Sequence, residues 1–382
     1  MRKVSIKTGP PVEGNDFYGR EKELQYAWKN HILKGGSLLL SAPRRVGKSS
    51  FAKKMLNIAE KKGWKTLYLD LQGLSSEYDF IKLFKEELQK EKWWEKIKSK
   101  IGDIIKSIEG FEIAGNKVSI NSNGWRSDTY GKIKQLLDST GEILIVIDEL
   151  TIYLNHLLIQ ENGKERIEFF LEWLRSLRQT TKSRWILCSS ISIENFTSMH
   201  QLSKHFNDVH SFSIGAFSED EAKDFISRLD VDENVKFTQE HIQCILDKLR
   251  WYLPFFIQIF ANEIDRLISE GKQLSNETID EAYNVLITRP YFNTWVERLK
   301  DYGELEDSAR KILKSCSLPN GESRKNLLAN LTVKKSDIEK IENNLAELLS
   351  MLKNDGYLTE QNDKYIFRSP LLRDFWYARY VK

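Results

Sequence analysis

The sequence contains little cysteine. Its 382 residues include three cysteines, Cys188, Cys244 and Cys316, which are scattered singly without any C-x-x-C spacing. Disulfide frameworks and structural zinc sites are built from paired or closely spaced cysteines. The pattern therefore argues against both and suits a protein of a reducing compartment.

Long apolar runs are also absent. The N-terminal "MRKVSIKTGPPVEG" lacks the apolar core of a signal peptide, and no stretch approaches the roughly 18 apolar residues of a membrane span. We therefore expect a cytoplasmic protein without membrane association. The net charge of +3 is close to balance, so it indicates no strong attraction to a polyanion.

The rest of the composition is that of a folded protein. Hydrophobic residues make up 41% of the chain and charged residues 30%. The length exceeds the ~100–200 residues of one typical domain, so we expect two or three domains, each with its own core.

The segment "SLLLSAPRRVGKSSFAKKML", residues 37–56, has the pattern of a phosphate-binding loop. The apolar "SLLLSA" is typical of a buried strand, and the residues after Gly47 continue as a helix that stops at Gly63. Strand, loop and helix in this order bring backbone N–H groups and the helix N-terminus together, which is what a phosphate group needs.

Each part of this loop has an expected role. Gly47 lets the backbone approach the phosphates, Lys48 reaches the β- and γ-phosphates, and the Ser49 hydroxyl binds Mg²⁺. Ala42 stands in place of the usual first glycine, which is tolerated if this position has an ordinary φ. The residues expected at the nucleotide are Pro43, Arg44, Arg45, Val46, Gly47, Lys48, Ser49 and Ser50. For the two arginines, phosphate, a neighbouring group and solvent are all open alternatives.

A second part of the site follows another buried strand. In "EILIVIDELTIYL" five apolar residues, Ile143 to Ile147, are followed directly by Asp148 and Glu149. We expect Asp148 to hold the magnesium shell and Glu149 to polarise the attacking water. The alternative is a strand that ends in two surface acids, but the loop upstream favours one phosphoryl-transfer site.

Two further runs complete the expected parallel sheet. "GWKTLYLDLQG" (63–73) is the strand after the loop helix, and "SRWILCSSIS" (183–192) is a buried run that ends in Ser189 and Ser190. The Ser189 hydroxyl is a candidate for sensing the γ-phosphate. Ordinary turn chemistry explains a serine at a strand end equally well.

These motifs occur in a specific order. "DFYGREKEL" (16–24), "SAPRRVGKSS", "LYLDLQGLSS", "ILIVIDEL" and "ILCSSIS" are followed by "GAFSEDEAKDFI" and "LPFFIQIFANEI". Together they resemble the archaeal-type P-loop ATPases of the AAA+/STAND group, which also occur in bacteria. The resemblance extends to the C-terminus, where "LKNDGYLTEQNDKYIFRSPLLRDFWYARY" looks like the terminal winged helix of that group.

The resemblance implies an α/β P-loop NTPase domain, with a parallel sheet flanked by helices, followed by an all-α lid and a winged-helix domain. The expected division is an N-terminal arm (1–15), a P-loop ATPase domain (16–215), a helical lid (216–297) and a winged-helix domain (298–382).

The resemblance also implies nucleotide contacts outside the loop. Phe17, Tyr18 and Gly19 match the box that lies beside the adenine, and Pro254 matches the lid proline that approaches the nucleotide. The glycine often found shortly before that proline is replaced here by Trp251 and Tyr252.

One element of the group's pattern is missing. Lys204 and His205 stand where an arginine finger is usual. Arg175 and Arg178 are alternative candidates, although arginines on a helix are more often simply solvated.

The expected winged helix is not basic. Its candidate recognition helix, Ile338 to Leu352, carries Glu339, Glu342 and Glu347, and its wing "TEQNDK" has little positive charge. Since phosphate contacts need Lys and Arg, we favour a regulatory role with a protein partner or self-association. The residues that keep DNA as an alternative are Arg324, Lys334 and Lys335.

The sequence therefore predicts an ATP-dependent molecular switch. ATP and Mg²⁺ bind between the P-loop domain and the lid, hydrolysis is slow or stimulated by a partner, and the lid and winged helix change position. The alternative is a DNA-associated ATPase, a loader or transposition-like regulator, whose winged helix holds duplex. A small-molecule kinase is disfavoured by the acid pair Asp148–Glu149 and by the lack of an evident acceptor pocket.

Overall fold

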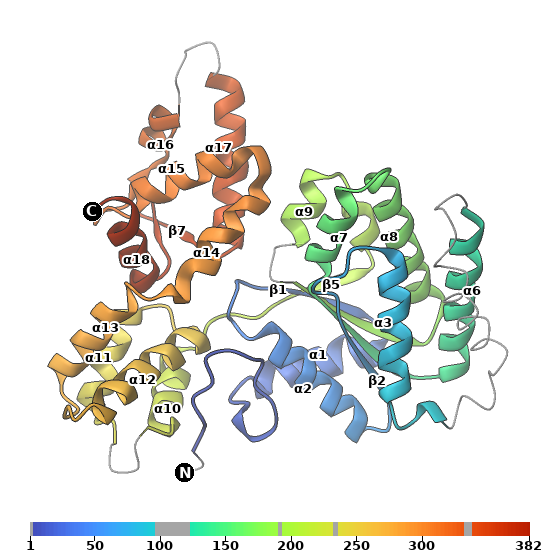
Figure 1. The fold of residues 1–382 in the computed structure, drawn as a ribbon, viewed down its shortest axis with the longest axis horizontal. Coiled ribbons are helices and arrows are strands. Elements are labelled where there is room, and N and C mark those ends of the chain that lie inside the picture. The colour runs from blue at the N-terminus through green and yellow to red at the C-terminus, as the bar shows by residue number, and fades with distance from the viewer. Residues whose placement is uncertain (1–2, 96–122, 190–192, 232–235, 332–337) are drawn as a thin grey trace. The chain divides into compact units, whose positions relative to one another are not determined.

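A computed structural model describes the chain apart from residues 1–2, 96–122, 190–192, 232–235 and 332–337 (Figure 1). The chain forms two compact units. Unit 1 comprises Met1–Gly19, Ala42–Gly47 and Gly215–Lys382, and unit 2 comprises Arg20–Ser41 and Lys48–Ile214. Residues 42–47 of the phosphate-binding loop thus group with unit 1, while the strand before them and the helix after them belong to unit 2.

Unit 2 is built on a parallel five-stranded sheet. Its strands are β1 (Ser37–Ser41), β2 (Lys65–Asp70), β3 (Ile143–Asp148), β4 (Ser183–Cys188) and β5 (Val209–Ser213). Their order across the sheet is β2-β3-β4-β1-β5, and every pairing is parallel. Because β4 lies between β1 and β3, the carboxyl ends of these three strands adjoin at one edge.

Helices cover both faces of this sheet (Figure 1). They are α1 (Glu21–Asn30), α2 (Lys48–Lys61), α3 (Glu77–Lys90), α6 (Asn123–Thr140), α7 (Leu150–Leu158), α8 (Gly163–Thr180) and α9 (Ile193–Met199), with short 3-10 helices at Ile32–Lys34 and Ser203–Phe206.

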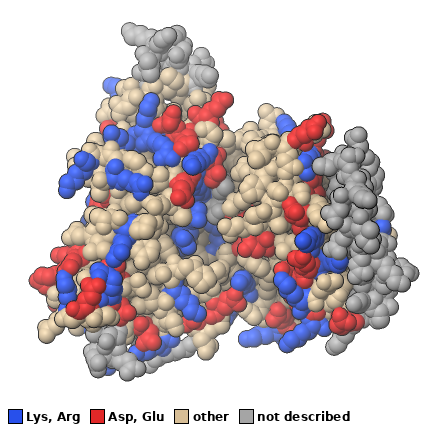
Figure 2. Space-filling model, in the orientation of Figure 1, with Lys and Arg blue, Asp and Glu red and all other residues tan. Residues whose placement is uncertain are grey.

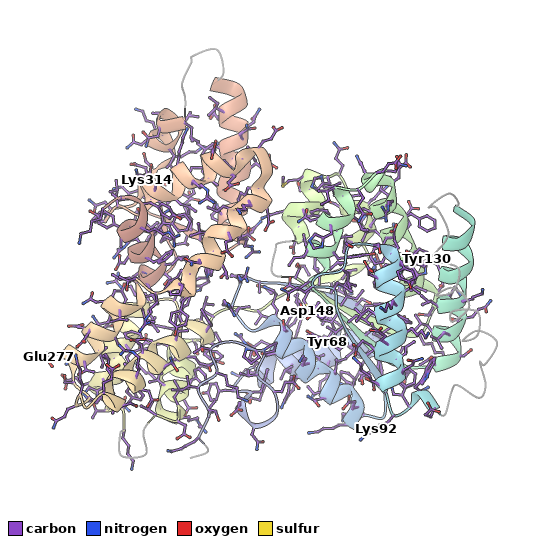
Figure 3. All side chains as sticks on the ribbon, in the orientation of Figure 1. Tyr68, Lys92, Tyr130, Asp148, Glu277 and Lys314 are labelled. Carbon is purple, nitrogen blue, oxygen red and sulfur yellow. The ribbon has the colours of Figure 1, made fainter. Side chains whose placement is uncertain are left out.

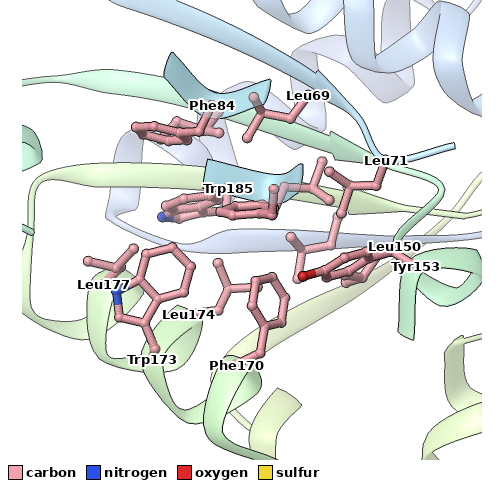
Figure 4. Packing of buried hydrophobic residues seen from close by; sticks show 14 of the residues in the cluster. Leu69, Leu71, Phe84, Leu150, Tyr153, Phe170, Trp173, Leu174, Leu177 and Trp185 are labelled. Atoms are coloured by element: carbon pink, nitrogen blue, oxygen red, sulfur yellow. The ribbon is translucent and has the colours of Figure 1, made fainter. Parts of the chain in front are cut away.

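The apolar run of β3 is buried along its whole length, as its sequence predicts. Strand residues alternate between the two faces of a sheet, so one face of β3 carries Ile147 and the other carries Val146 and Asp148. Ile147 belongs to a core that also includes Trp185 of β4 and Phe170 of α8 (Figure 4). Helix α2 packs against β2, β3 and β4 on the opposite face, so Asp148 lies on the face that α2 covers.

The part of unit 1 that follows β5 starts with a group of four helices. These are α10 (Glu219–Arg228), α11 (Gln239–Leu249), α12 (Pro254–Ser269) and α13 (Asn276–Leu286). A capping box starts α10, in which Ser218 accepts from the Glu221 N–H and the Glu221 side chain accepts from the Ser218 N–H. The N-terminal arm, which contains a 3-10 helix at Gly14–Asp16, joins this group through a bridge between Val4 and Leu229.

The C-terminal part of unit 1 has the element order expected of a winged helix. It comprises 3-10 helices at Pro290–Phe292 and Arg298–Leu305, α14 (Asn293–Glu297), α15 (Glu306–Cys316), β6 (Glu322–Ser323), α16 (Arg324–Leu331), α17 (Ile338–Asn354), β7 (Leu358–Gln361), β8 (Lys364–Phe367) and α18 (Pro370–Tyr380). The strands form an antiparallel sheet in the order β6-β8-β7. Asn362 and Asp363, both with positive φ, make the tight turn of the wing.

The predicted fold class is confirmed, with a helix-flanked parallel sheet, an all-helical group and a small winged-helix arrangement in this order along the chain. The four-part domain division remains a prediction. Of the helices in the described ranges, none combines the length and apolarity needed to cross a bilayer.

Candidate functional site

Three predicted site residues lie at the adjoining strand ends of unit 2. Lys48 opens α2, Asp148 ends β3, and Ser189 directly follows β4. Their exposed fractions are only 7%, 4% and 6%. Polar residues are seldom this buried, so three of them at one edge of the sheet make this edge the candidate site.

The Asp148 carboxylate is held on both of its oxygens. The Tyr68 hydroxyl donates to Oδ2 at 2.7 Å, and the Glu149 backbone N–H donates to Oδ1 at 3.0 Å. Figure 3 labels Tyr68 and Asp148 on the neighbouring strands β2 and β3. In the register of these strands Tyr68 is opposite Val146, so its ring reaches diagonally along the same face to Asp148.

Tyr68 contacts the candidate site, and it is not among the residues predicted from the sequence. Burial and the neighbouring Asp148 charge raise the pKa of Tyr68, so the phenol remains protonated and acts as a donor. The Lys53 ammonium of α2 lies 5.1 Å from the Tyr68 ring centroid. The signal in the sequence was a phenol between Leu67 and Leu69 of "KTLYLD", two residues before the end of the expected strand.

Glu149 and Ser189 are brought together. Glu149 adopts left-handed dihedrals, with φ 56° and ψ 34°, at the start of α7. The Ser189 Oγ accepts from the Thr151 N–H at 3.3 Å and donates to Glu149 Oε2 over a long 3.4 Å. This serine therefore orients the acid that we expect to act on water. Its contact with a γ-phosphate remains a prediction.

The loop backbone explains the departure at Ala42. Ala42 does not have a positive φ, whereas Gly47 has a φ of 98° and Arg45 a φ of 66°. A Cβ on Gly47 would meet no atom within 4 Å. The glycine is therefore needed for its dihedral angle, and it leaves open space beside the backbone where a phosphate could approach. Alanine at position 42 is compatible with this loop.

The loop arginines differ in their surroundings. Arg45 lies with its guanidinium carbon 4.4 Å from the centroid of the Phe255 ring, at the start of α12 in the same unit. Burial lowers the pKa of Arg45, and its Nε has no hydrogen-bond partner among the described residues. The alternative of a neighbouring group thus applies to Arg45. Arg44 is half-buried, and its charge acts on Asp301 in the same unit.

The remaining loop residues have varied exposure. Val46 is almost fully buried, and Ser50 is buried in the first turn of α2. Ser49 and Pro43 are half-buried. Within unit 1, Pro43 is so close to Gly356 that a Cβ there would lie 2.7 Å from the Pro43 Cβ.

The predicted adenine-side residues lie near the helical group of unit 1. The Tyr18 ring contacts those of Phe217 and Phe225, with centroid distances of 5.6 and 4.9 Å, and its hydroxyl donates to Asp224 at 2.5 Å. Phe17 is half-buried, Gly19 has a φ of 68°, and Pro254 is the first residue of α12. Their contacts with a nucleotide stay predictions.

One candidate substitute for the arginine finger has a structural role. Arg178 donates from Nε and Nη2 to the two oxygens of Asp208, both at 2.9 Å, and from Nη2 to the His205 carbonyl at 2.7 Å. Its side chain is 2% exposed. Arg175 is more exposed and donates to the Lys204 carbonyl at 3.2 Å. This bidentate pair holds Arg178 against Asp208, the residue directly before β5.

The residues present suit a magnesium–nucleotide complex. Mg²⁺ prefers oxygen ligands and commonly takes one or two from protein and the rest from phosphate and water. The Ser49 hydroxyl and the Asp148 carboxylate are of that type, and a carboxylate that accepts two hydrogen bonds keeps lone pairs for a hydrated ion. Lys48 supplies the positive charge, and its field reaches Cys188 at the end of β4.

Comparisons with known proteins agree with this architecture. No protein-family model matches the sequence, and no curated protein matches it. Among solved structures, the Walker-type ATPase PABY2304 of Pyrococcus abyssi is 18% identical with a TM-score of 0.63, covering 97% of this chain and 99% of that one. This chain has a Walker-type ATPase fold. The ORC2 protein of Aeropyrum pernix, solved in ADPNP–ADP complexes, is 11% identical with a TM-score of 0.54, covering 96% of each chain.

Proposed function

We propose that the chain binds ATP with Mg²⁺ and hydrolyses it slowly or on stimulation by a partner. The observation that carries the proposal is the meeting of Lys48, the Asp148–Glu149 pair and Ser189 at the adjoining ends of β1, β3 and β4. Phosphoryl transfer needs a cation for the phosphates, an acid for the metal shell and an acid for the attacking water. The Walker-type ATPase fold supports the same assignment.

Lys48 and Asp148 have complementary roles in binding. The Lys48 ammonium neutralises charge on the β- and γ-phosphates, and magnesium, when bound, neutralises the charge that develops on them during transfer. Asp148 and Ser49 would hold that ion. Tyr68 fixes the Asp148 carboxylate before the ligand arrives, which lowers the cost of organising the site.

Glu149 is the proposed general base. Its carboxylate takes a proton from the attacking water, and Ser189 restrains one carboxylate oxygen through the 3.4 Å hydrogen bond. Glu149 has a strained, left-handed backbone at the N-cap of α7, and this backbone sets the direction of its side chain.

We further infer that the lid and the winged helix change position with nucleotide state. This inference is supported by the membership of residues 42–47 in the same compact unit as α12 and the C-terminal elements. The loop would bind phosphate, and it contacts Phe255 of α12 through Arg45. A change in the loop when nucleotide binds or leaves could therefore shift α12. We expect the output to be a protein partner or self-association.

DNA association remains the alternative output. The exposed residues Glu342 and Glu347 lie on α17, the candidate recognition helix, and place negative charge where phosphates would approach. We therefore rank a protein-directed switch above a DNA loader or a transposition-like regulator.

The proposed binding role is tested by Lys48→Ala with Lys61→Ala as the matched control on the same helix. Lys61 is exposed in the last turn of α2. Loss of charge-assisted hydrogen bonds of ~1.5–3 kcal/mol should weaken ATP binding roughly tenfold to a hundredfold. Calorimetry that gave both variants the wild-type affinity for Mg·ATP would remove the proposal.

A further inference from the structure

A cavity of about 240 Å³ lies within unit 1, away from the phosphate-binding loop in sequence. It is lined by Asp247, Lys248 and Arg250 at the end of α11, by Tyr283 of α13, and by Pro370 and Arg373 of α18. Helix α18 packs against both α11 and α13, so the cavity is formed by the helical group together with the last helix of the chain.

The lining is rich in positive charge. The lining contains three cationic side chains, Lys248, Arg250 and Arg373, and one carboxylate, Asp247. The Asp247 carboxylate already accepts a hydrogen bond from Gln243 at 2.9 Å. Two of the cations have acidic partners outside the lining. Lys248 pairs with Asp280, and the Arg373 Nε donates to Asp374 at 2.7 Å.

Arg250 differs from the other two cations. It is exposed, and among the described residues no carboxylate pairs with its guanidinium. Its backbone has a φ of 50° at the C-terminal cap of α11, a position that favours glycine. An arginine here brings a full set of unused N–H donors to the mouth of the cavity.

Tyr283 gives the cavity a fixed wall. Its hydroxyl donates to Asp374 at 2.6 Å, and the Lys248 ammonium lies 5.3 Å from its ring centroid. The Tyr283 hydroxyl is therefore already used. The donors that remain for a ligand are the N–H groups of Lys248, Arg250 and Arg373 that their acidic partners do not take up. On the face drawn in Figure 2, acidic and basic side chains are interspersed.

We propose that this cavity binds the phosphate group of a small phosphorylated molecule. Guanidinium groups match phosphate oxygens in a bidentate geometry, and here they come from two helices that converge on one space. The volume is below the ~300–1,000 Å³ typical of drug-sized ligand sites, so it suits a phosphate with a small organic part. Bound phosphate would connect α11 to α18 and stabilise the packing of the C-terminal helix. This site is independent of the proposed ATPase function.

Inorganic phosphate is the probe, and full-length Lys48→Ala is the background, because the loop itself could otherwise bind the probe. Titration calorimetry measures the affinity for phosphate, and thermal unfolding is compared with and without phosphate. In this background Arg250→Gln and Arg373→Gln should each weaken phosphate binding about tenfold or more and remove its stabilising effect. Arg289→Gln, an exposed position outside the lining, should change neither.

Arg250→Gln keeps the test decisive, because this exposed side chain has no ion pair among the described residues whose loss could unfold the protein. Phosphate binding that is unchanged in both lining variants would overturn the proposal. Weaker binding of duplex DNA in these variants, with phosphate affinity unaltered, would also overturn it and indicate a nucleic-acid surface instead.

Discussion

The Tyr68 hydroxyl of β2 donates a 2.7 Å hydrogen bond to Oδ2 of Asp148 at the end of the neighbouring strand β3. The aspartate that we assign to the magnesium shell is thus oriented by a neighbouring strand as well as by its own backbone. We therefore propose Tyr68 as a positioning residue, whose contribution can be measured apart from nucleotide affinity.

We expect Tyr68→Phe to fold normally and to hydrolyse ATP about tenfold more slowly. The reason is the loss of one hydrogen bond to a charged group, worth ~1.5–3 kcal/mol when fully expressed. The variant should also need more Mg²⁺ for half-maximal rate. Steady-state rates over a magnesium titration measure both effects, with Tyr26→Phe, an exposed tyrosine on α1, as the control. Equal magnesium requirements in all three proteins would show that Tyr68 does not position Asp148.

Much of the secondary structure around the candidate site could be predicted from local sequence. The apolar run 143–147 became β3, the expected strands 63–73 and 183–192 contain β2 and β4, and the Ser218 cap starts α10. These features depend on residues close together in the chain, where hydrophobic periodicity and capping rules apply.

The pairings across the sheet could not be predicted in this way. The Tyr68–Asp148 bond needs the register of β2 against β3, and the contact of Ser189 with Glu149 needs β4 inserted between β1 and β3. Strand order and register are set by long-range packing, which a single sequence does not display. For the same reason the sequence alone does not show that Arg178 pairs with Asp208.

A second prediction concerns the buried ion pair in unit 1. Arg298 and Asp355 lie 3.0 Å apart with side chains 2% exposed, and the Tyr302 hydroxyl donates to the same carboxylate at 2.8 Å. Asp355→Ala leaves the guanidinium buried without its partner, so we expect about 3–5 kcal/mol of destabilisation in urea unfolding. The double variant Arg298→Met with Asp355→Leu should recover most of this loss. A single variant as stable as wild type would show that water or other groups compensate the arginine.

The stability of unit 2 should decrease in mild acid. Burial, with help from His210 and Lys34, lowers the pKa of His31 below that of an unfolded histidine. As the pH falls below about 6.5, the histidine is therefore protonated in the unfolded chain before it is protonated in the folded one. The free energy of unfolding decreases over this range and stops decreasing once the pH is below the folded pKa. His31→Phe keeps a ring beside His210 and should show a smaller loss, measured by denaturant unfolding across this pH range. Identical pH profiles would assign the effect to other groups.

The winged helix should bind duplex DNA weakly. For a helix that binds DNA phosphates, the logarithm of the association constant falls linearly with the logarithm of the salt concentration. The slope is about −0.9 for each phosphate neutralised. We expect a shallow slope, because Glu342 and Glu347 of α17 are acidic. Lys334 and Lys335, the lysines expected to contact phosphate, lie outside the described residues. Duplex titrations at several salt concentrations, with and without ATP, measure it. Tight binding that is lost when the two lysines are neutralised would favour the DNA-associated alternative.

The most direct test of the proposed chemistry is Glu149→Gln, measured for both ATP affinity and hydrolysis. The amide keeps the size of the side chain and cannot accept the proton of the attacking water. We predict Mg·ATP affinity close to wild type and hydrolysis at least about a hundredfold slower than a wild-type enzyme that is itself active, alone or with a partner. Hydrolysis at the wild-type rate in Glu149→Gln would contradict the account.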